Sequence, residues 1–203
     1  MPARTETNLH GLSRRAVLLA VAASALPRRA WAQAAAGVPS EVSAAISQAR
    51  RAGSGDFRYF GFLVYHATLW VGPQGLGAQL GETPFALQLR YARSLKGADI
   101  AARSEEEMRK LGEGTPQQRA AWLQAMQRLF PDVADGDTLT GVFTPAGALP
   151  AQTRFYFNGA RRGAENGVSF ARAFFSIWLS PQTPAPGLRR DLLANLGEQS
   201  TQP

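Results

Sequence analysis

A long run of the sequence, DFRYFGFLVYHATLWV from Asp56 to Val71, is apolar or aromatic at nearly every position. A strand with one face in solvent alternates apolar and polar residues, and this run does not. Both faces of the predicted opening strand are therefore expected to be covered. Arg58 carries a charge near the start of the run. It either lies at the exposed mouth of the strand or stands beside an apolar pocket in order to hold a ligand.

The segments around this strand show alternating and helical patterns in turn. A first helix is predicted from near Ser40, and Gly53 and Gly55 are expected to release the chain into the opening strand. The segment FALQLRYA alternates and predicts a half-exposed strand. Two capping boxes predict helix starts, one at Ser104 and one at Thr115.

The second half of the chain predicts two more strands and two more helices. DTLTGVF and TRFYFNG are strand candidates, with Asn158 and Gly159 as a turn signal. The helix SFARAFFSIWL, opened by Ser169, is apolar almost all round, so it is expected to be buried on several sides or to line a cavity. A short closing helix follows. Strands and helices in this order predict an α+β domain with a mostly antiparallel sheet.

Residues 1–32 have the composition of an export signal. Paired arginines in SRRAVLL precede an apolar run that is too short to span a bilayer, and AWA offers a cleavage site near Ala32. The pair resembles a twin-arginine signal, which predicts a periplasmic protein without a stable membrane anchor. An ordinary secretory signal and an uncleaved anchor are the alternatives.

The predicted cleavage changes the net charge. The chain carries a formal charge of +7, but five of its 22 basic residues and one of its 15 acidic residues lie in residues 1–32, so the remainder carries about +3. Such a small and scattered charge predicts no nucleic-acid partner. The chain has no cysteine, which excludes disulfides and thiol catalysis. Residues 33–203 suit a single domain.

Four segments in this order resemble the bacterial chalcone isomerase-like domain: VYHATLWV, ALQLRYARSLKGADIAARSEEEMRKLG, GDTLTGVFTP and NGARRGAENGVSFARAFFSIWLSPQTPAP. The resemblance covers residues 53–196. It leaves residues 33–52 as a lead segment with the first helix and residues 197–203 as a disordered tail. It implies an open-faced β-sandwich, in which a curved antiparallel sheet carries a layer of helices with a ligand cleft between them.

The resemblance also implies roles for particular residues. Plant members of the family cyclise chalcones and others bind fatty acids, and an arginine at the head of the opening strand contacts the ligand in catalytic members. Arg58 matches that arginine by position. Val64 stands where plant enzymes have a threonine, and GADIAARSEEEM contains neither their tyrosine nor their asparagine, which argues against chalcone cyclisation. Tyr59, Tyr65, Tyr91 or Tyr156 would have to substitute in space.

Other chemistry finds little support in the sequence. His66 is the one histidine beyond residues 1–32, and alone on a strand it is more often a core or rim residue than a base. The acidic run PDVADGD lacks the spacing of a calcium loop and favours a turn. No cofactor and no metal site are expected. The many aromatic residues are either packed core or the walls of a slot.

Three hypotheses remain. The first is an exported protein that binds a small apolar acid, such as a fatty acid, without cyclising chalcones. The second is an isomerase or intramolecular lyase acting on an enolisable substrate, with Arg58 as its catalytic residue. The third is a structural or partner-binding domain, whose protein partner is unknown. The expected ligand-binding residues are Arg58, Phe60, Phe62, Val64, Phe174 and Trp178.

Overall fold

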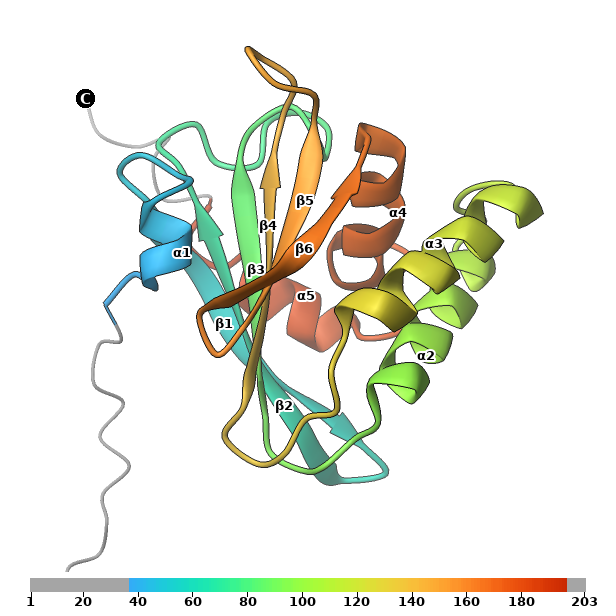
Figure 1. The fold of residues 1–203 in the computed structure, drawn as a ribbon. Coiled ribbons are helices and arrows are strands. Elements are labelled where there is room, and N and C mark those ends of the chain that lie inside the picture. The colour runs from blue at the N-terminus through green and yellow to red at the C-terminus, as the bar shows by residue number, and fades with distance from the viewer. Residues whose placement is uncertain (1–36, 197–203) are drawn as a thin grey trace, which may run out of the picture. The chain divides into compact units, whose positions relative to one another are not determined.

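The computed structural model of the protein describes residues 37–196, which form a six-stranded antiparallel sheet with helices (Figure 1). The predicted signal of residues 1–32 and the predicted tail of residues 197–203 lie outside the described residues. The strands, whose order in the sheet follows the chain, are β1 (Arg50–Tyr59), β2 (Phe62–Val71), β3 (Phe85–Tyr91), β4 (Thr138–Thr144), β5 (Gln152–Phe157) and β6 (Ala160–Asn166). The helices are α1 (Ser40–Ser43), α2 (Gly97–Lys110), α3 (Pro116–Leu129), α4 (Val168–Leu179) and α5 (Pro186–Leu192).

The two faces of the sheet are covered unequally. The main core lies on the face that packs against α2 to α5, and its largest fully buried side chains include Phe85, Phe143, Phe155 and Phe175. The other face carries a small cluster in which Trp70 packs with Val42 of α1. An antiparallel sheet with helices on one face confirms the predicted α+β class and the open-faced architecture.

The predicted opening strand is wrong in one respect, because the run Asp56–Val71 is two strands. β1 and β2 form a hairpin whose last pair is Tyr59 with Phe62, and the turn consists of Phe60 and Gly61. Both turn residues have positive φ, 47° and 82°, as a two-residue hairpin of type I′ requires. Phe at the first turn position is not a turn signal, so the hydrophobic pattern hid the reversal.

Gly53 and Gly55 lie inside β1 and do not separate the first helix from the opening strand. α1 is only four residues long, and β1 already begins at Arg50. A side chain at Gly53 would overlap the backbone oxygens of Asp191 and Leu192, and one at Gly55 would crowd the side chain of Asp191. These glycines therefore let α5 lie directly on β1.

The first predicted capping box is also wrong. α2 begins at Gly97, seven residues before Ser104, whose hydroxyl donates to the backbone oxygen of Ile100 within the helix. The start is capped from a distance, since the Gly97 N–H donates to Asp132 Oδ1 at 2.9 Å. Asp132 belongs to the acidic run that was interpreted as a turn, and a cap contributed from far along the chain leaves no local signal.

Among the remaining elements, one cap and one turn confirm the sequence analysis and two strands differ from it. Thr115 and Gln118 form the predicted capping box of α3, and Asn158 with Gly159 forms the turn after β5. β6 was missed because its residues are mostly polar and exposed. β3 is more buried than its alternation predicted, because α1 covers part of the second face.

A candidate binding cavity between the sheet and the helices

A cavity of about 290 Å³ lies on the helix face of the sheet. β2 and β3 form its floor, α2 and α4 form its sides, and the link between α4 and α5 closes one edge. Its volume is at the lower end of the range of roughly 300–1,000 Å³ that is typical of small-molecule sites. The apolar part of the wall includes Phe57, Val64, Leu89, Leu95, Phe130 and Phe174.

A β-bulge in β2 shapes the floor of the cavity. Phe57 pairs with Tyr65 and Arg58 pairs with Leu63, so Val64 is an extra residue between two consecutive pairs. Val64 still has a backbone partner, because its oxygen accepts from the Ala92 N–H at 2.9 Å. The bulge lets the consecutive residues Val64 and Tyr65 both line the cavity, which a regular strand would not allow.

The structure brings together three of the six predicted binding residues. Val64, Phe174 and Trp178 line the cavity. Phe60 and Phe62 lie at the hairpin tip, where they are 84% and 70% exposed, and neither lines the cavity. Both were expected beside the other binding residues because the sequence analysis assumed an uninterrupted strand, whereas a turn stands between β1 and β2.

Arg58 also lies outside the cavity wall. It follows Phe57 in β1, whose side chain lines the cavity, so alternation directs Arg58 to the opposite face of the sheet. There its guanidinium contacts Asp56 at 3.2 Å and the Gly61 oxygen at 3.4 Å. Asp56 also binds His66 Nδ1 at 2.9 Å, and this hydrogen bond, more than the contact with Arg58, lowers the pKa of the Asp56 carboxyl.

Two tyrosine hydroxyls form the polar end of the cavity. Trp178 Nε1–H donates to the Tyr65 oxygen at 2.9 Å, which leaves the proton of Tyr65 available to another acceptor. The ring of Tyr91 lies 5.9 Å from that of Tyr65, and the Tyr91 hydroxyl has no hydrogen-bond partner among residues 37–196. Burial raises the pKa of both tyrosines well above the ordinary value of 10.0, so both remain neutral donors at physiological pH.

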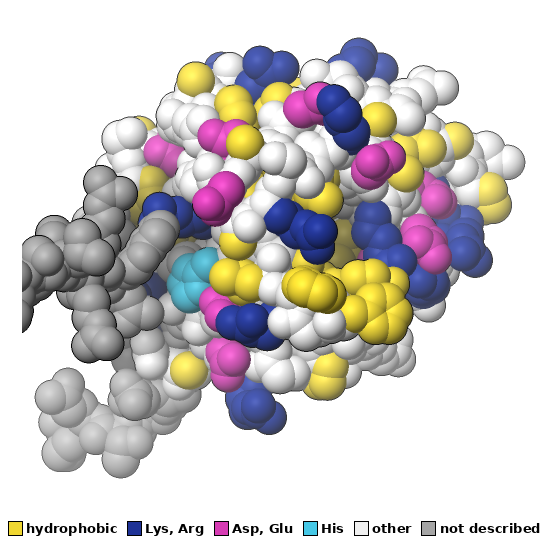
Figure 2. All heavy atoms as spheres, turned by 90° about the horizontal axis from the view of Figure 1, so that it is seen from below, with side chains coloured by type: hydrophobic (Ala, Val, Ile, Leu, Met, Phe, Trp, Pro, Cys, Tyr) yellow, Lys and Arg dark blue, Asp and Glu magenta, His cyan; other side chains and the backbone are white. Residues whose placement is uncertain are grey.

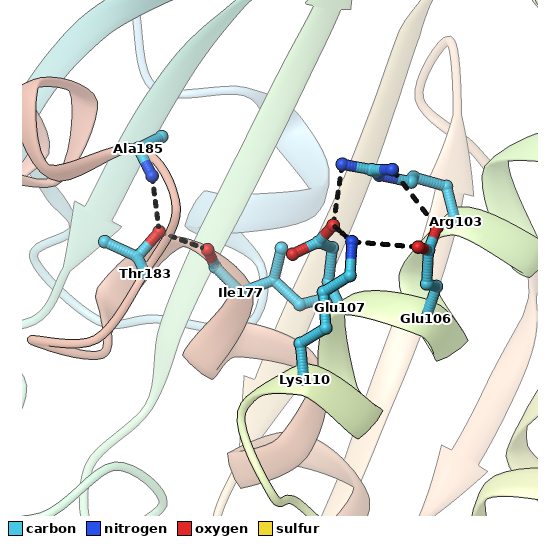
Figure 3. Close-up of polar contacts among 7 residues, drawn as sticks. All are labelled: Arg103, Glu106, Glu107, Lys110, Ile177, Thr183 and Ala185. Carbon is cyan, nitrogen blue, oxygen red and sulfur yellow. Dashed lines mark hydrogen bonds and ion pairs between the residues drawn. The ribbon is translucent and has the colours of Figure 1, made fainter.

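α2 contributes an ion-pair cluster, which Figure 3 shows, and two of its members line the cavity. Arg103 contacts Glu106 at 3.1 Å and Glu107 at 2.7 Å, and Lys110 contacts the same two carboxylates at 2.8 and 3.2 Å. Arg103 and Glu107 line the cavity, and both influence the pKa of Tyr65 electrostatically after the larger effect of burial. Glu107 is only 5% exposed, and the two cations balance its charge.

The opposite edge of the cavity is held by the link between α4 and α5. The buried Thr183 hydroxyl donates to the Ile177 oxygen at 2.6 Å and accepts from the Ala185 N–H at 3.2 Å (Figure 3). These bonds fix the turn that presents Pro184 and Ala185 to the cavity. This edge is therefore pinned by its own hydrogen bonds.

Sequence analysis named Tyr65 and Tyr91 as spatial substitutes but missed Arg103. The helix was expected to start at Ser104, which left Arg103 outside it. With the start at Gly97, the cavity-lining residues Ile100, Arg103, Ser104 and Glu107 follow the i, i+3, i+4, i+7 spacing of one helix face. That spacing was the available signal. Residues 37–196 contain no group of three or more His, Asp or Glu side chains placed to hold a metal ion.

Comparisons with known proteins agree with this architecture. Residues 33–194 match the model of a family described as chalcone isomerase-like. A protein of Haemophilus influenzae, described as uncharacterized, is 32% identical over 117 residues, which cover 57% of this chain and 54% of that protein, so the chain spans about half the length of this relative. The crystal structure of a fatty-acid binding protein of Arabidopsis thaliana matches with a TM-score of 0.58 and 14% identity, over 73% of this chain and 88% of that one. At that identity the match shows a shared fold.

Proposed function

Because this chain belongs to the chalcone isomerase-like family, we propose that it binds a small apolar acid, such as a fatty acid, in the cavity between the sheet and α2. The observation that carries the proposal is an apolar cavity whose wall includes the hydrogen-bond donors Tyr65, Tyr91 and Arg103, with the carboxylate of Glu107 paired to Arg103. Small-molecule sites combine an apolar wall with a few placed polar groups in this way. The fatty-acid binding protein of Arabidopsis thaliana, which shares the fold, supports the ligand class.

The acid head would lie at the polar end, between Arg103 and the tyrosine hydroxyls. A guanidinium has five N–H donors, and Arg103 uses two nitrogens for Glu106 and Glu107, which leaves donors for a ligand carboxylate. Tyr65 and Tyr91 would donate from the side of the sheet. Trp178, by donating to Tyr65, strengthens the Tyr65 hydroxyl as a donor.

This assignment replaces Arg58 as the anchor. Arg58 lies on the other face of the sheet and is engaged by Asp56, so a ligand in the cavity would not reach it. Chalcone cyclisation is not part of the proposal, since the threonine, tyrosine and asparagine of the plant enzymes are absent from the matching positions in the opening strand and α2.

The test is isothermal titration of residues 33–203 with dodecanoic acid and with dodecanol, which share an alkyl chain and differ in the head group. Arg103→Gln should weaken binding of the acid about tenfold and leave the alcohol unchanged, since a charge-assisted hydrogen bond contributes about 1.5–3 kcal/mol and solvent screening reduces it here. Arg109→Gln is the matched control, because Arg109 is exposed on the same helix, as Arg103 is, but does not line the cavity. Arg58→Gln is the second control.

Two results would contradict the proposal. If the wild type binds neither compound, the cavity is not a site for this ligand class. If Arg58→Gln weakens binding of the acid and Arg103→Gln does not, the acid lies elsewhere. Thermal unfolding of each variant shows whether a loss of binding is a loss of fold.

We also propose that residues 1–32 export the protein to the periplasm by the twin-arginine route. The paired arginines, the short apolar run and the small residues before Gln33 support this proposal. Fractionation of cells that produce the whole chain tests it. The wild type is expected in the periplasm, and replacing Arg14 and Arg15 by lysine should retain the protein in the cytoplasm. Periplasmic protein in the variant would point to another route.

A further inference from the structure

The β1–β2 hairpin ends in a cluster of exposed aromatic side chains, which we call the aromatic tip: Tyr59, Phe60 and Phe62. They are 52%, 84% and 70% exposed. Among residues 37–196, Leu149 is the one other large hydrophobic side chain that is comparably exposed. The rings of Tyr59 and Phe60 lie edge to face, 4.5 Å apart, at the end of the strand pair. A contiguous apolar cluster of this kind is typical of an interaction site.

The turn itself argues that the aromatic tip is retained for a reason other than folding. Phe60 has a φ of 47°, a conformation that Asn or Gly adopts readily at this position and that strains a bulky residue. The strained residue is also the most exposed of the three. Within residues 37–196 the Phe60 ring packs on the Tyr59 ring and is otherwise exposed, which favours a partner outside the chain.

Exposed arginines stand on the strand ends beside the aromatic tip. They are Arg58, Arg90 and Arg93; Asp56 pairs with Arg58, and Asp135 is exposed in the link that leads from beside β3 into β4. Figure 2 looks onto this end and shows hydrophobic side chains gathered beside Lys and Arg side chains, with Asp and Glu side chains among them. Apolar rings flanked by arginines suit a surface that combines acyl chains with negative charge.

We propose that the aromatic tip inserts into the boundary between head groups and acyl chains of a bilayer that contains anionic phospholipids. Tyr59 can place its hydroxyl among the head groups while Phe60 and Phe62 enter the apolar layer. Among residues 37–196, no helix is both long enough and apolar enough to cross a membrane.

The aromatic tip adjoins the cavity along the same strands. Tyr59 and Phe62 pair with each other two residues beyond Phe57 and Val64, both of which line the cavity. By alternation, and with the bulge at Val64, these four side chains share the helix face of the hairpin. An apolar molecule passing between the bilayer and the cavity would follow this row. The inference goes beyond the proposed function, because docking needs the aromatic tip and binding needs the cavity.

The test is sedimentation of residues 33–203 with vesicles of phosphatidylglycerol and phosphatidylethanolamine, and with vesicles of phosphatidylcholine alone. The wild type should sediment with the anionic vesicles and less with the neutral ones. Phe60→Asn combined with Phe62→Ser should lower the partition coefficient between vesicles and water about tenfold or more, because the variant lacks the two rings that the bilayer would bury. Leu149→Ser is the matched control. It removes an exposed apolar side chain from the β4–β5 link and should leave sedimentation unchanged.

The single variant Phe60→Asn separates vesicle binding from folding. Asn suits the positive φ at this position, so the melting temperature should stay equal or rise. The proposal is overturned if the wild type ignores both kinds of vesicle, or if the tip variant sediments like the wild type. It is also overturned if the tip variant changes the oligomeric state in sedimentation velocity and not vesicle binding, because the occupant is then a second copy. Titration of the tip variant with dodecanoic acid reports on the proposed function separately.

Discussion

Replacing each cavity tyrosine by phenylalanine should separate stability from ligand binding. Tyr65→Phe removes the oxygen that accepts from Trp178, whose side chain is only 6% exposed. An unsatisfied buried donor costs about 1–3 kcal/mol. Tyr91→Phe removes a hydroxyl that has no partner among residues 37–196, so its effect on the free energy of unfolding should be close to zero.

The assay is thermal unfolding of residues 33–203 without added ligand, followed by titration with dodecanoic acid. A change of 1 kcal/mol shifts the melting temperature of a domain of this size by about 2–4 °C. Tyr65→Phe should therefore melt roughly 2–12 °C lower, and Tyr91→Phe should melt with the wild type. Both variants should bind the acid more weakly. If the two variants melt at the same temperature, the hydrogen bond from Trp178 to Tyr65 does not contribute the expected stability.

Three further predictions concern the fold and its pH dependence. Gly53→Ala should destabilise the protein by about 1–3 kcal/mol in urea unfolding, because the added methyl overlaps a backbone oxygen of α5. Gly147→Ala is the control and should be tolerated, because the space around Gly147 is open. Equal effects of the two substitutions would contradict the close contact at Gly53. Thr115→Ala should cost about 1 kcal/mol by removing the capping box of α3, and an unchanged urea midpoint would count against that box. Burial raises the pKa of Tyr65 and Tyr91 above the unfolded value of 10.0, so their contribution to stability is complete below about pH 10 and is lost as pH rises through the folded values. The melting temperature should therefore fall above pH 10, and it should fall less for the variant that combines Tyr65→Phe with Tyr91→Phe. An equal fall would mean that other groups cause the alkaline loss of stability.

The order of strands and helices was predictable because buried apolar residues recur with the period of a helix or a strand. The apolar helix α4 and the capping box at Thr115 are local signals, and both stand where they were expected. The resemblance to the chalcone isomerase-like family placed these elements in one sheet with a helix layer, and the family match and the sheet confirm it.

The cavity wall was only partly predictable, because two local irregularities change which face each residue occupies. The expected binding residues Arg58 and Val64 were taken from one uninterrupted strand, but the turn at Phe60 and Gly61 and the bulge at Val64 change which face each side chain occupies. A Phe in a type I′ turn resembles a residue within a strand, and nothing in the local sequence marks the bulge. The cap on α2 comes from Asp132, far along the chain, so the helix face that carries Arg103 could not be aligned from its own residues.

The most direct test of the central claim is mass spectrometry of small molecules extracted from the protein after purification from the cell envelope. The wild type, Arg103→Gln and Arg58→Gln would be produced as whole chains and treated identically. The account predicts that an apolar acid is released by the wild type and by Arg58→Gln and is depleted in Arg103→Gln. An acid that is depleted only in Arg58→Gln, or the absence of any apolar molecule from the wild type, would contradict it.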